Sequence, residues 1–424
     1  MRYGLFLRAT SSWMMLALVL GLLLFLPCPR AAAETTITWG VMSGPQWEER
    51  YNRIIAAFEK AHPDIKVKWV GIDWPFQEKL LTLIAAGEGP DVIRIDVENL
   101  PEYVEMGMLE DLNPYLKRET SDPLEGVFPA AVRGFVYRGR LYGIPQSVTV
   151  SSTYYNVDLF EAGGVVRPSD QWTWSDMVTV AKRLTKDRNG DNRIDQFGLY
   201  LTSDYVEWLP LLYSHGGDVL DQEGRVVFDS PASLAAFSLY QSFRQSAHIA
   251  PRPGELAGTF QDGYFGMIMM CDWVRQIYRN IQAFRWDIAT IPAGPKGQVA
   301  FIGGGAMGIN AASRKKDQAW EFVKFFTSEA VQNIVVDLNV GVPVRERIAI
   351  ERYVGPKPNP PHLLTVIQML RVARWAPQHP RWRDMLAAIN QGLPGLLNGQ
   401  TSPAQFITKT ADSLRAIAAK PVSR

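Results

Sequence analysis

The segment 187–195 has the residue types and spacing of a calcium-binding loop. Its oxygen ligands would come from positions 1, 3, 5, 7 and 9, which are Asp187, Asn189, Asp191, Arg193 (through its carbonyl) and Asp195. Two residues depart from the pattern, because the glycine expected at position 6 is Asn192 and the acid expected at position 12 is Gly198. The segment therefore predicts either a structural calcium site or a solvated turn built by Asp and Asn.

Motifs for enzyme chemistry are absent from the sequence. None of the five histidines is spaced as a metal-binding pair, and there is neither a nucleophile elbow nor a phosphate loop. The glycines of 303–308 match the spacing of a dinucleotide fingerprint, but Ile309 and Asn310 continue a strand pattern, so either a close-packed turn or a backbone that must approach a ligand is expected. Asp96 and Glu98 could act as a glycosidase pair, or could form hydrogen bonds at a strand end. We expect a protein that is not an enzyme and requires no cofactor.

The N-terminal third predicts alternating strands and helices. Strand patterns cover 36–41, 65–70 and 91–95, and helix patterns follow Pro45 and cover 76–86. This order predicts a parallel sheet with helices on its faces.

Such sheets bind ligands beyond the carboxyl ends of their strands, which here carry Ser43, Trp74 and Asp96. Near the other end of the chain, Ser402 and Gln405 have the spacing of a capping box that opens a last helix.

The composition is that of a folded soluble protein of two or three domains. The 424 residues are 47% hydrophobic and 21% charged, and 44 basic against 43 acidic side chains leave no excess of charge for nucleic acid. The only other cysteine lies in the N-terminal region, so Cys271 has no partner for an internal disulfide. It is expected to be a small buried side chain.

Residues 1–33 have the features of a secretory signal. Arginines precede an apolar run over 13–26, and small residues at 31–33 predict cleavage before Glu34. The alternatives are an uncleaved anchor, for which the run is short, and lipidation of Cys28, which lacks the preceding small residue. We expect an exported protein, in a periplasm or on the outer face of the cytoplasmic membrane.

Several short motifs, in their order and spacing, resemble the extracellular solute-binding proteins of ABC importers, specifically the maltose-binding-protein-like sugar-binding group. The motifs are Ile37-Thr38-Trp39, Ala57-Phe58-Glu59-Lys60, Ile65-Lys66-Val67, 85–91, Leu141-Tyr142-Gly143-Ile144-Pro145, Tyr154-Tyr155-Asn156, 308–313 and Ala319-Trp320-Glu321-Phe322. The resemblance implies a type II α/β fold, with a ligand cleft between two lobes joined by a multi-crossing hinge. Lobe 1 would comprise 34–145 with 301–340, and lobe 2 would comprise 146–300 with 341–424.

The same resemblance implies a set of ligand-binding residues. Four aromatic side chains stand where sugar-stacking plates are expected, each with a core position as the alternative: Tyr205, Trp208, Trp273 and Trp382. The polar partners of the sugar hydroxyls would be Ser43, Asp96, Glu98, Gln146, Ser147 and Arg345.

The implied function is that of a monomeric receptor that captures a sugar or oligosaccharide and delivers it to the permease of an ABC importer. Ser43, Gly44 and Ser147 depart from the acidic and basic residues of maltose-binding protein, which argues against maltose itself. The alternatives are a non-sugar solute, such as a glycerophosphodiester or a polyamine, and a secreted carbohydrate-active enzyme.

Overall fold

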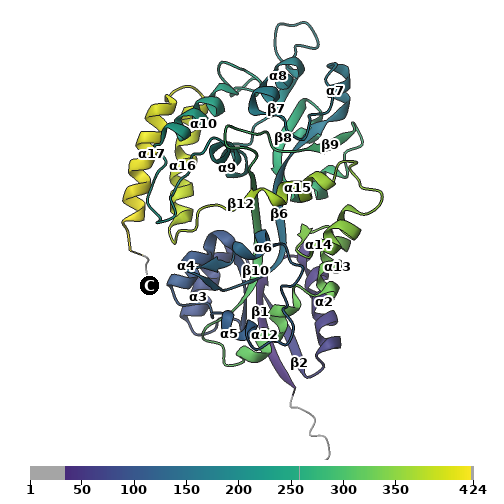
Figure 1. The fold of residues 1–424 in the computed structure, drawn as a ribbon, viewed down its shortest axis with the longest axis vertical. Coiled ribbons are helices and arrows are strands. Elements are labelled where there is room, and N and C mark those ends of the chain that lie inside the picture. Colours follow the sequence, from purple (N-terminus) through teal and green to yellow (C-terminus); the bar gives the residue numbers. More distant parts are fainter. Residues whose placement is uncertain (1–33, 257, 422–424) are drawn as a thin grey trace, which may run out of the picture.

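The structure is a computed structural model that describes residues 34–256 and 258–421. These residues form two α/β lobes, one above the other in Figure 1. The predicted secretory signal, residues 1–33, lies outside the described residues. No helix in the described part of the chain combines the length and apolarity needed to cross a bilayer.

The first lobe begins with the predicted alternation of strands and helices. The elements are β1 (Thr35–Met42), α2 (Pro45–Ala61), β2 (Ile65–Ile72), α3 (Phe76–Ala85) and β3 (Val92–Asp96). Both β2 and β3 pair with β1 in parallel, which confirms the predicted sheet.

Helix α2 shows why this segment folds as the sequence indicates. Pro45 occupies the first turn, where its missing N–H costs nothing, and the chain leaves the helix at His62. Tyr51, Ile54 and Phe58 recur at helical spacing and are buried against the sheet. This packing fixes which face of α2 turns away from solvent.

Two long strands, β6 (Ile144–Asn156) and β10 (Ala300–Ile309), run from one lobe into the other (Figure 1). The main sheet has the order β2-β1-β3-β10-β6-β8-β7. Strand β6 pairs with β10 up to Val150 and, from there on, with β8 (Phe265–Cys271) and β9 (Trp286–Ala289). The hinge is therefore built of continuous backbone.

The remaining elements follow in chain order. Between β3 and β6 they are η1 (Val97–Asn99), α4 (Leu100–Glu105), α5 (Asn113–Leu116), α6 (Pro129–Arg133), β4 (Val136–Tyr137) and β5 (Arg140–Leu141). Between β6 and β10 they are α7 (Val157–Ala162), α8 (Trp174–Leu184), β7 (Phe197–Tyr200), α9 (Tyr205–Ser214), α10 (Pro231–Ser242), η2 (Phe260–Asp262), β8, η3 (Asp272–Val274), α11 (Arg275–Tyr278) and β9. After β10 they are α12 (Lys316–Phe325), α13 (Glu329–Asp337), β11 (Val342–Pro343), α14 (Glu346–Ile348), η4 (Ala349–Val354), α15 (Leu364–Arg371), β12 (Ala373–Arg374), α16 (Trp382–Leu397) and α17 (Pro403–Ala418).

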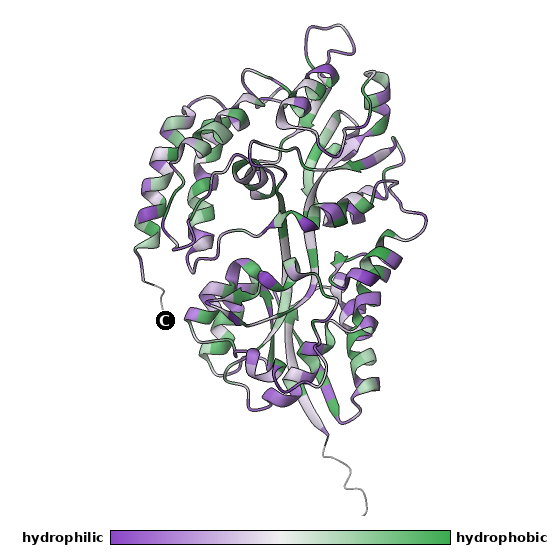
Figure 2. Ribbon diagram, in the orientation of Figure 1, coloured by the Kyte–Doolittle hydropathy of each residue, from purple (hydrophilic) through white to green (hydrophobic). Residues whose placement is uncertain are grey.

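Each lobe has its own hydrophobic core. One core draws its residues from 37–144 and 306–334, and the other from 127–131, 148–302 and 342–414. Figure 2 shows hydrophobic residues along the central strands, whereas the outer helices α16 and α17 carry hydrophobic and hydrophilic residues in turn. The Ser402 capping box at the start of α17 is confirmed.

The glycine-rich segment lies within β10 and forms no dinucleotide loop. The register of β10 against β6 shifts between Gly305 and Ala306. A Cβ atom on Gly304 would lie 2.8 Å from the carbonyl oxygen of Ser147. The glycines thus allow two hinge strands to approach closely, within a strand rather than at the predicted close-packed turn.

Candidate functional site

A cavity of about 430 Å³ lies where the two lobes meet, beyond the carboxyl end of β3. Its walls come from α2 and β3 of the first lobe, from the crossing strands β6 and β10, and from α9, η3 and α11 of the second lobe. A volume of this size falls in the range of small-molecule sites.

Six of the ten predicted ligand-binding residues line this cavity. They are Asp96, Glu98, Gln146, Ser147, Tyr205 and Trp273. These residues come from five elements, most of them far apart in the sequence, which begin, end or cross at the lobe junction: β3, η1, β6, α9 and η3.

Trp273 lines the cavity, with 47% of its surface exposed. The preceding residue, Asp272, is buried and accepts hydrogen bonds from Thr149 Oγ1 at 2.7 Å and the Val150 N–H at 3.2 Å. Tyr353 donates to its other oxygen at 3.2 Å. These bonds hold η3 against β6, so Trp273 stays turned out of the core.

The two carboxylates are held differently. Asp96 forms an ion pair with Arg94, with 2.5 Å between Oδ1 and Nη2. Glu98 accepts a hydrogen bond from the Tyr205 hydroxyl at 3.1 Å, which joins the two lobes across the cavity. Burial, together with the negative charge of Asp96, raises the pKa of Glu98 to about 7.

The cavity also contains residues that the sequence analysis did not select, notably Trp47, Arg50 and Arg94. Trp47 and Arg50 are on the face of α2 that continues through Tyr51 and Ile54. The sequence held one signal for Arg50, which is its place on the apolar face of an amphipathic helix. Buried positions rarely hold an unpaired arginine, so a charge there indicates a special role.

Trp208 and Trp382 are corrected to core side chains. Each is only 1% exposed within the second core, and neither lines the cavity. Trp208 lies inside α9 and packs against Phe237, with 6.1 Å between ring centroids. Both were implied by the family resemblance, which does not reveal the side of a helix that faces the core.

Ser43 and Arg345 also lie outside the cavity wall. The Ser43 hydroxyl donates to Asp73 at the exposed end of β1. The Arg345 guanidinium donates to the backbone carbonyls of Thr327 and Glu125, so it ties loops of the first lobe together.

The predicted calcium loop forms a set of Asx turns. Asp187 accepts from the backbone N–H groups of Gly190 and Asn192, each at 2.7 Å, and Asp191 accepts from Arg193 at 2.8 Å. No group of three or more acidic, histidine or cysteine side chains is gathered as a metal site anywhere in the described ranges. Calcium binding by this loop stays a prediction, to be checked by calorimetry on metal-stripped protein.

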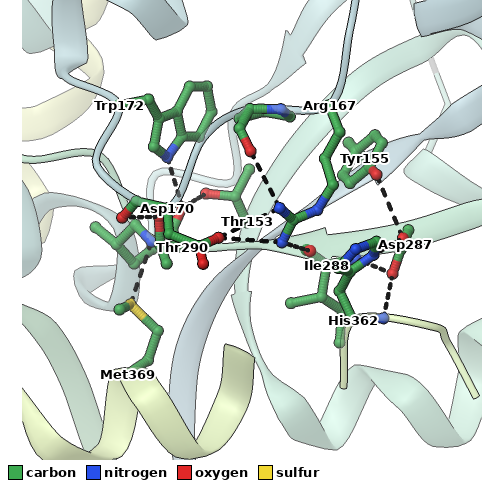
Figure 3. A network of polar contacts seen from close by, with 12 residues as sticks. Thr153, Tyr155, Arg167, Asp170, Trp172, Asp287, Ile288, Thr290, His362 and Met369 are labelled. Carbon is green, nitrogen blue, oxygen red and sulfur yellow. Dashed lines mark hydrogen bonds and ion pairs between the residues drawn. The ribbon is translucent and has the colours of Figure 1, made fainter. Parts of the chain in front are cut away.

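A larger hollow of about 820 Å³ lies beside β9 in the second lobe. Its edge contains a network centred on Asp287 (Figure 3), which accepts from Tyr155 at 3.3 Å and from His362 through its backbone N–H at 3.0 Å and Nδ1 at 2.5 Å. Arg167 and Thr290 extend the network to Asp170. Since these groups bond to one another, we assign the network a structural role.

Comparison with known proteins places the chain in a family. The model of the family described as bacterial extracellular solute-binding protein matches residues 44–333. A putative binding protein of Brucella abortus is 26% identical, over 91% of this chain and 93% of its own length. The diacetylchitobiose binding protein DasA of Streptomyces coelicolor is 25% identical, over 75% of each chain.

Among solved structures, an ABC substrate-binding protein of Listeria monocytogenes, in complex with cycloalternan, is similar, with a TM-score of 0.79 and 25% identity. The match covers 90% of this chain and 98% of that one. With the cavity between two lobes and the family model spanning more than half of the sequence, the chain belongs to the bacterial extracellular solute-binding proteins.

Proposed function

We propose that this protein is the extracytoplasmic receptor of an ABC importer, and that it captures a carbohydrate in the inter-lobe cavity and delivers it to the membrane permease. The observation that carries the proposal is Trp273, an aromatic plate held out of the core at the wall of a cavity lined by polar side chains. Sugar rings present apolar C–H faces that stack on such a plate, while hydroxyl groups bond to polar neighbours.

The named ligands of two relatives support the carbohydrate class. Cycloalternan and diacetylchitobiose are both saccharides, and each relative covers three quarters or more of this chain. The same relatives are binding proteins, which favours capture over conversion. We further propose that the protein is exported and acts as a monomer, with the permease as its partner.

Capture would proceed by closure of the lobes. The strands β6 and β10 cross the junction without interruption, and the Tyr205–Glu98 hydrogen bond joins the two sides of the cavity. Hinge closure around a ligand is the established motion of periplasmic binding proteins. A sugar that contacts both walls would stabilise the closed arrangement.

The test is a thermal-shift screen of the protein after unfolding and refolding to remove bound ligand, against mono- and oligosaccharides. At one hundred times the dissociation constant, a ligand should add about 2.7 kcal/mol to the free energy of unfolding. A raised melting temperature with a saccharide that is recovered unchanged supports the receptor. Release of shorter products would instead indicate an enzyme.

A further inference from the structure

Arg50 is a buried cation without a partner. It is 7% exposed and lines the inter-lobe cavity; its buried Nε has no hydrogen-bond partner, and the side chain forms no ion pair within the described part of the chain. Burial and the nearby Arg94 lower its pKa to about 10, which leaves it charged at neutral pH. A buried N–H without a partner is costly, so a ligand acceptor that pairs with this guanidinium would stabilise the complex.

The acidic residues of the cavity are already engaged. Asp96 is paired with Arg94, whose guanidinium and Asp96 both lie against the backbone of Gly305. Glu98 accepts from Tyr205, and its raised pKa keeps a large protonated fraction near neutral pH. The charged side chains that line the cavity therefore carry an excess of positive charge, which is centred on Arg50.

Other polar atoms in the cavity wall point to the same kind of ligand. Buried atoms without a partner include Trp47 Nε1, Arg50 Nε, Arg94 Nε and Gln146 Nε2, all in residues that line the cavity. Every one of these four atoms is an N–H donor. A donor-rich, positively charged wall is complementary to anionic oxygens, which accept charge-assisted hydrogen bonds.

We propose that the ligand is an acidic carbohydrate, whose carboxylate or phosphate group pairs with Arg50 while its sugar ring lies against Trp273. This inference rests on the proposed function, which supplies the carbohydrate; the new element is the anionic group that the carbohydrate carries. The cavity disfavours a polyamine, because a polycation would meet an unpaired guanidinium. One unpaired arginine matches a single negative charge, as in a uronic acid.

The first test compares ligands and needs no variant. Ligand-stripped protein is titrated calorimetrically with galacturonate and glucuronate oligomers, their neutral methyl esters, neutral galactose and glucose oligomers, sugar phosphates and a glycerophosphodiester. We expect a uronate oligomer or a sugar phosphate to bind at least tenfold more tightly than its neutral counterpart. The two arms identify which anion the site prefers.

The second test uses Arg50→Met, with Arg53→Met as a matched control on the same helix. Arg53 is 38% exposed at its side chain and is paired with Asp337 and Glu49 on the surface. Arg50→Met should weaken binding of the best acidic probe by tenfold or more without lowering the melting temperature, since it removes an unpaired buried charge. Arg53→Met should leave affinity unchanged.

The possible outcomes separate the two proposals. Tight binding of a neutral saccharide that is indifferent to Arg50→Met overturns the inference and leaves the carbohydrate receptor in place. Binding of the glycerophosphodiester alone, lost with Arg50→Met, supports the anion site but overturns the carbohydrate function. Failure of every anionic probe to bind overturns the inference.

Discussion

The Asp287 network and the inter-lobe cavity are both rich in polar groups, yet they differ in how these groups are paired. Around Asp287, the carboxylate accepts from Tyr155 and His362, and Arg167 donates to Asp170 and to backbone carbonyls (Figure 3). In the cavity, the buried Nε of Arg50 donates to no described residue. Arg167 also has an unpartnered Nε, but its other guanidinium nitrogens are bonded, so the two regions differ in whether the central charged group has a described partner.

This difference teaches how to separate polar groups that hold the fold from those that await a ligand. A paired buried group stabilises the native state only modestly, but losing its partner is costly. An unpaired buried donor lowers stability until a ligand completes it. Substitutions in the network should therefore affect folding, and substitutions in the cavity should affect binding.

The largest expected effect is on stability, from Asp287→Ala in the network. It leaves the Tyr155 hydroxyl and the His362 ring without their acceptor, so we expect a loss of about 3 kcal/mol in the free energy of unfolding. Urea unfolding measures this, with Asp412→Ala at an exposed ion pair as the control, which should change stability by less than about 0.5 kcal/mol. Weakened ligand binding in a folded Asp287→Ala protein would break the comparison.

The next effect is on affinity, from Trp273→Ala in the cavity. We expect binding of the saccharide found in the screen to weaken by about 1 to 3 kcal/mol, with little change in melting temperature because the ring is half exposed. The control is Tyr264→Ala, an aromatic residue that is 43% exposed outside the cavity and should leave affinity unchanged. A large loss of stability with intact affinity would reassign Trp273 to the core.

The smallest effect is a pH dependence from Glu98. Its pKa rises from 4.5 to about 7 on folding, so between these values the native state keeps a proton that the unfolded state releases. The contribution of protonated Glu98 to the free energy of unfolding is fully present below about pH 4.5 and is lost as the pH rises through 7. The free energy of unfolding should be lower at pH 8 than at pH 5. In Glu98→Gln this difference should be smaller by on the order of 1 kcal/mol, a modest amount because solvent in the cavity screens the carboxylate.

Glu207, which is fully buried and whose pKa is also raised to about 7 by burial, provides the control for that experiment. Its part of the pH dependence should remain in the Glu98→Gln protein. An unchanged pH profile in Glu98→Gln would mean that the cavity carboxylate is solvated like an ordinary surface acid.

Local signals accounted for the elements that the sequence predicted well. The strands β1 to β3 and the helix α2 follow from alternation, helical spacing and the position of Pro45, all within short segments. The capping box at Ser402 is equally local. Such features depend on residues a few positions apart along the chain, so they can be predicted from the sequence.

The cavity residues were predicted less completely, because their selection depends on contacts between distant segments. Asp96 was predicted from its place at a strand end and Trp273 from the family resemblance, and both line the cavity. Trp208 occupies a similar aromatic motif, but the packing of α9 turns it into the core. Arg50 was missed because its isolation is visible only when every neighbour is in place.

The sequence by itself determined the α/β alternation, the exclusion of common catalytic motifs and the family to which the chain belongs. Only the tertiary structure decided which side chains share the cavity and which of them lack partners. The physical reason is that a helix or strand is specified by residues a few positions apart, whereas the pairing of a buried charge is set by β3, α2, β6 and β10 meeting at one junction.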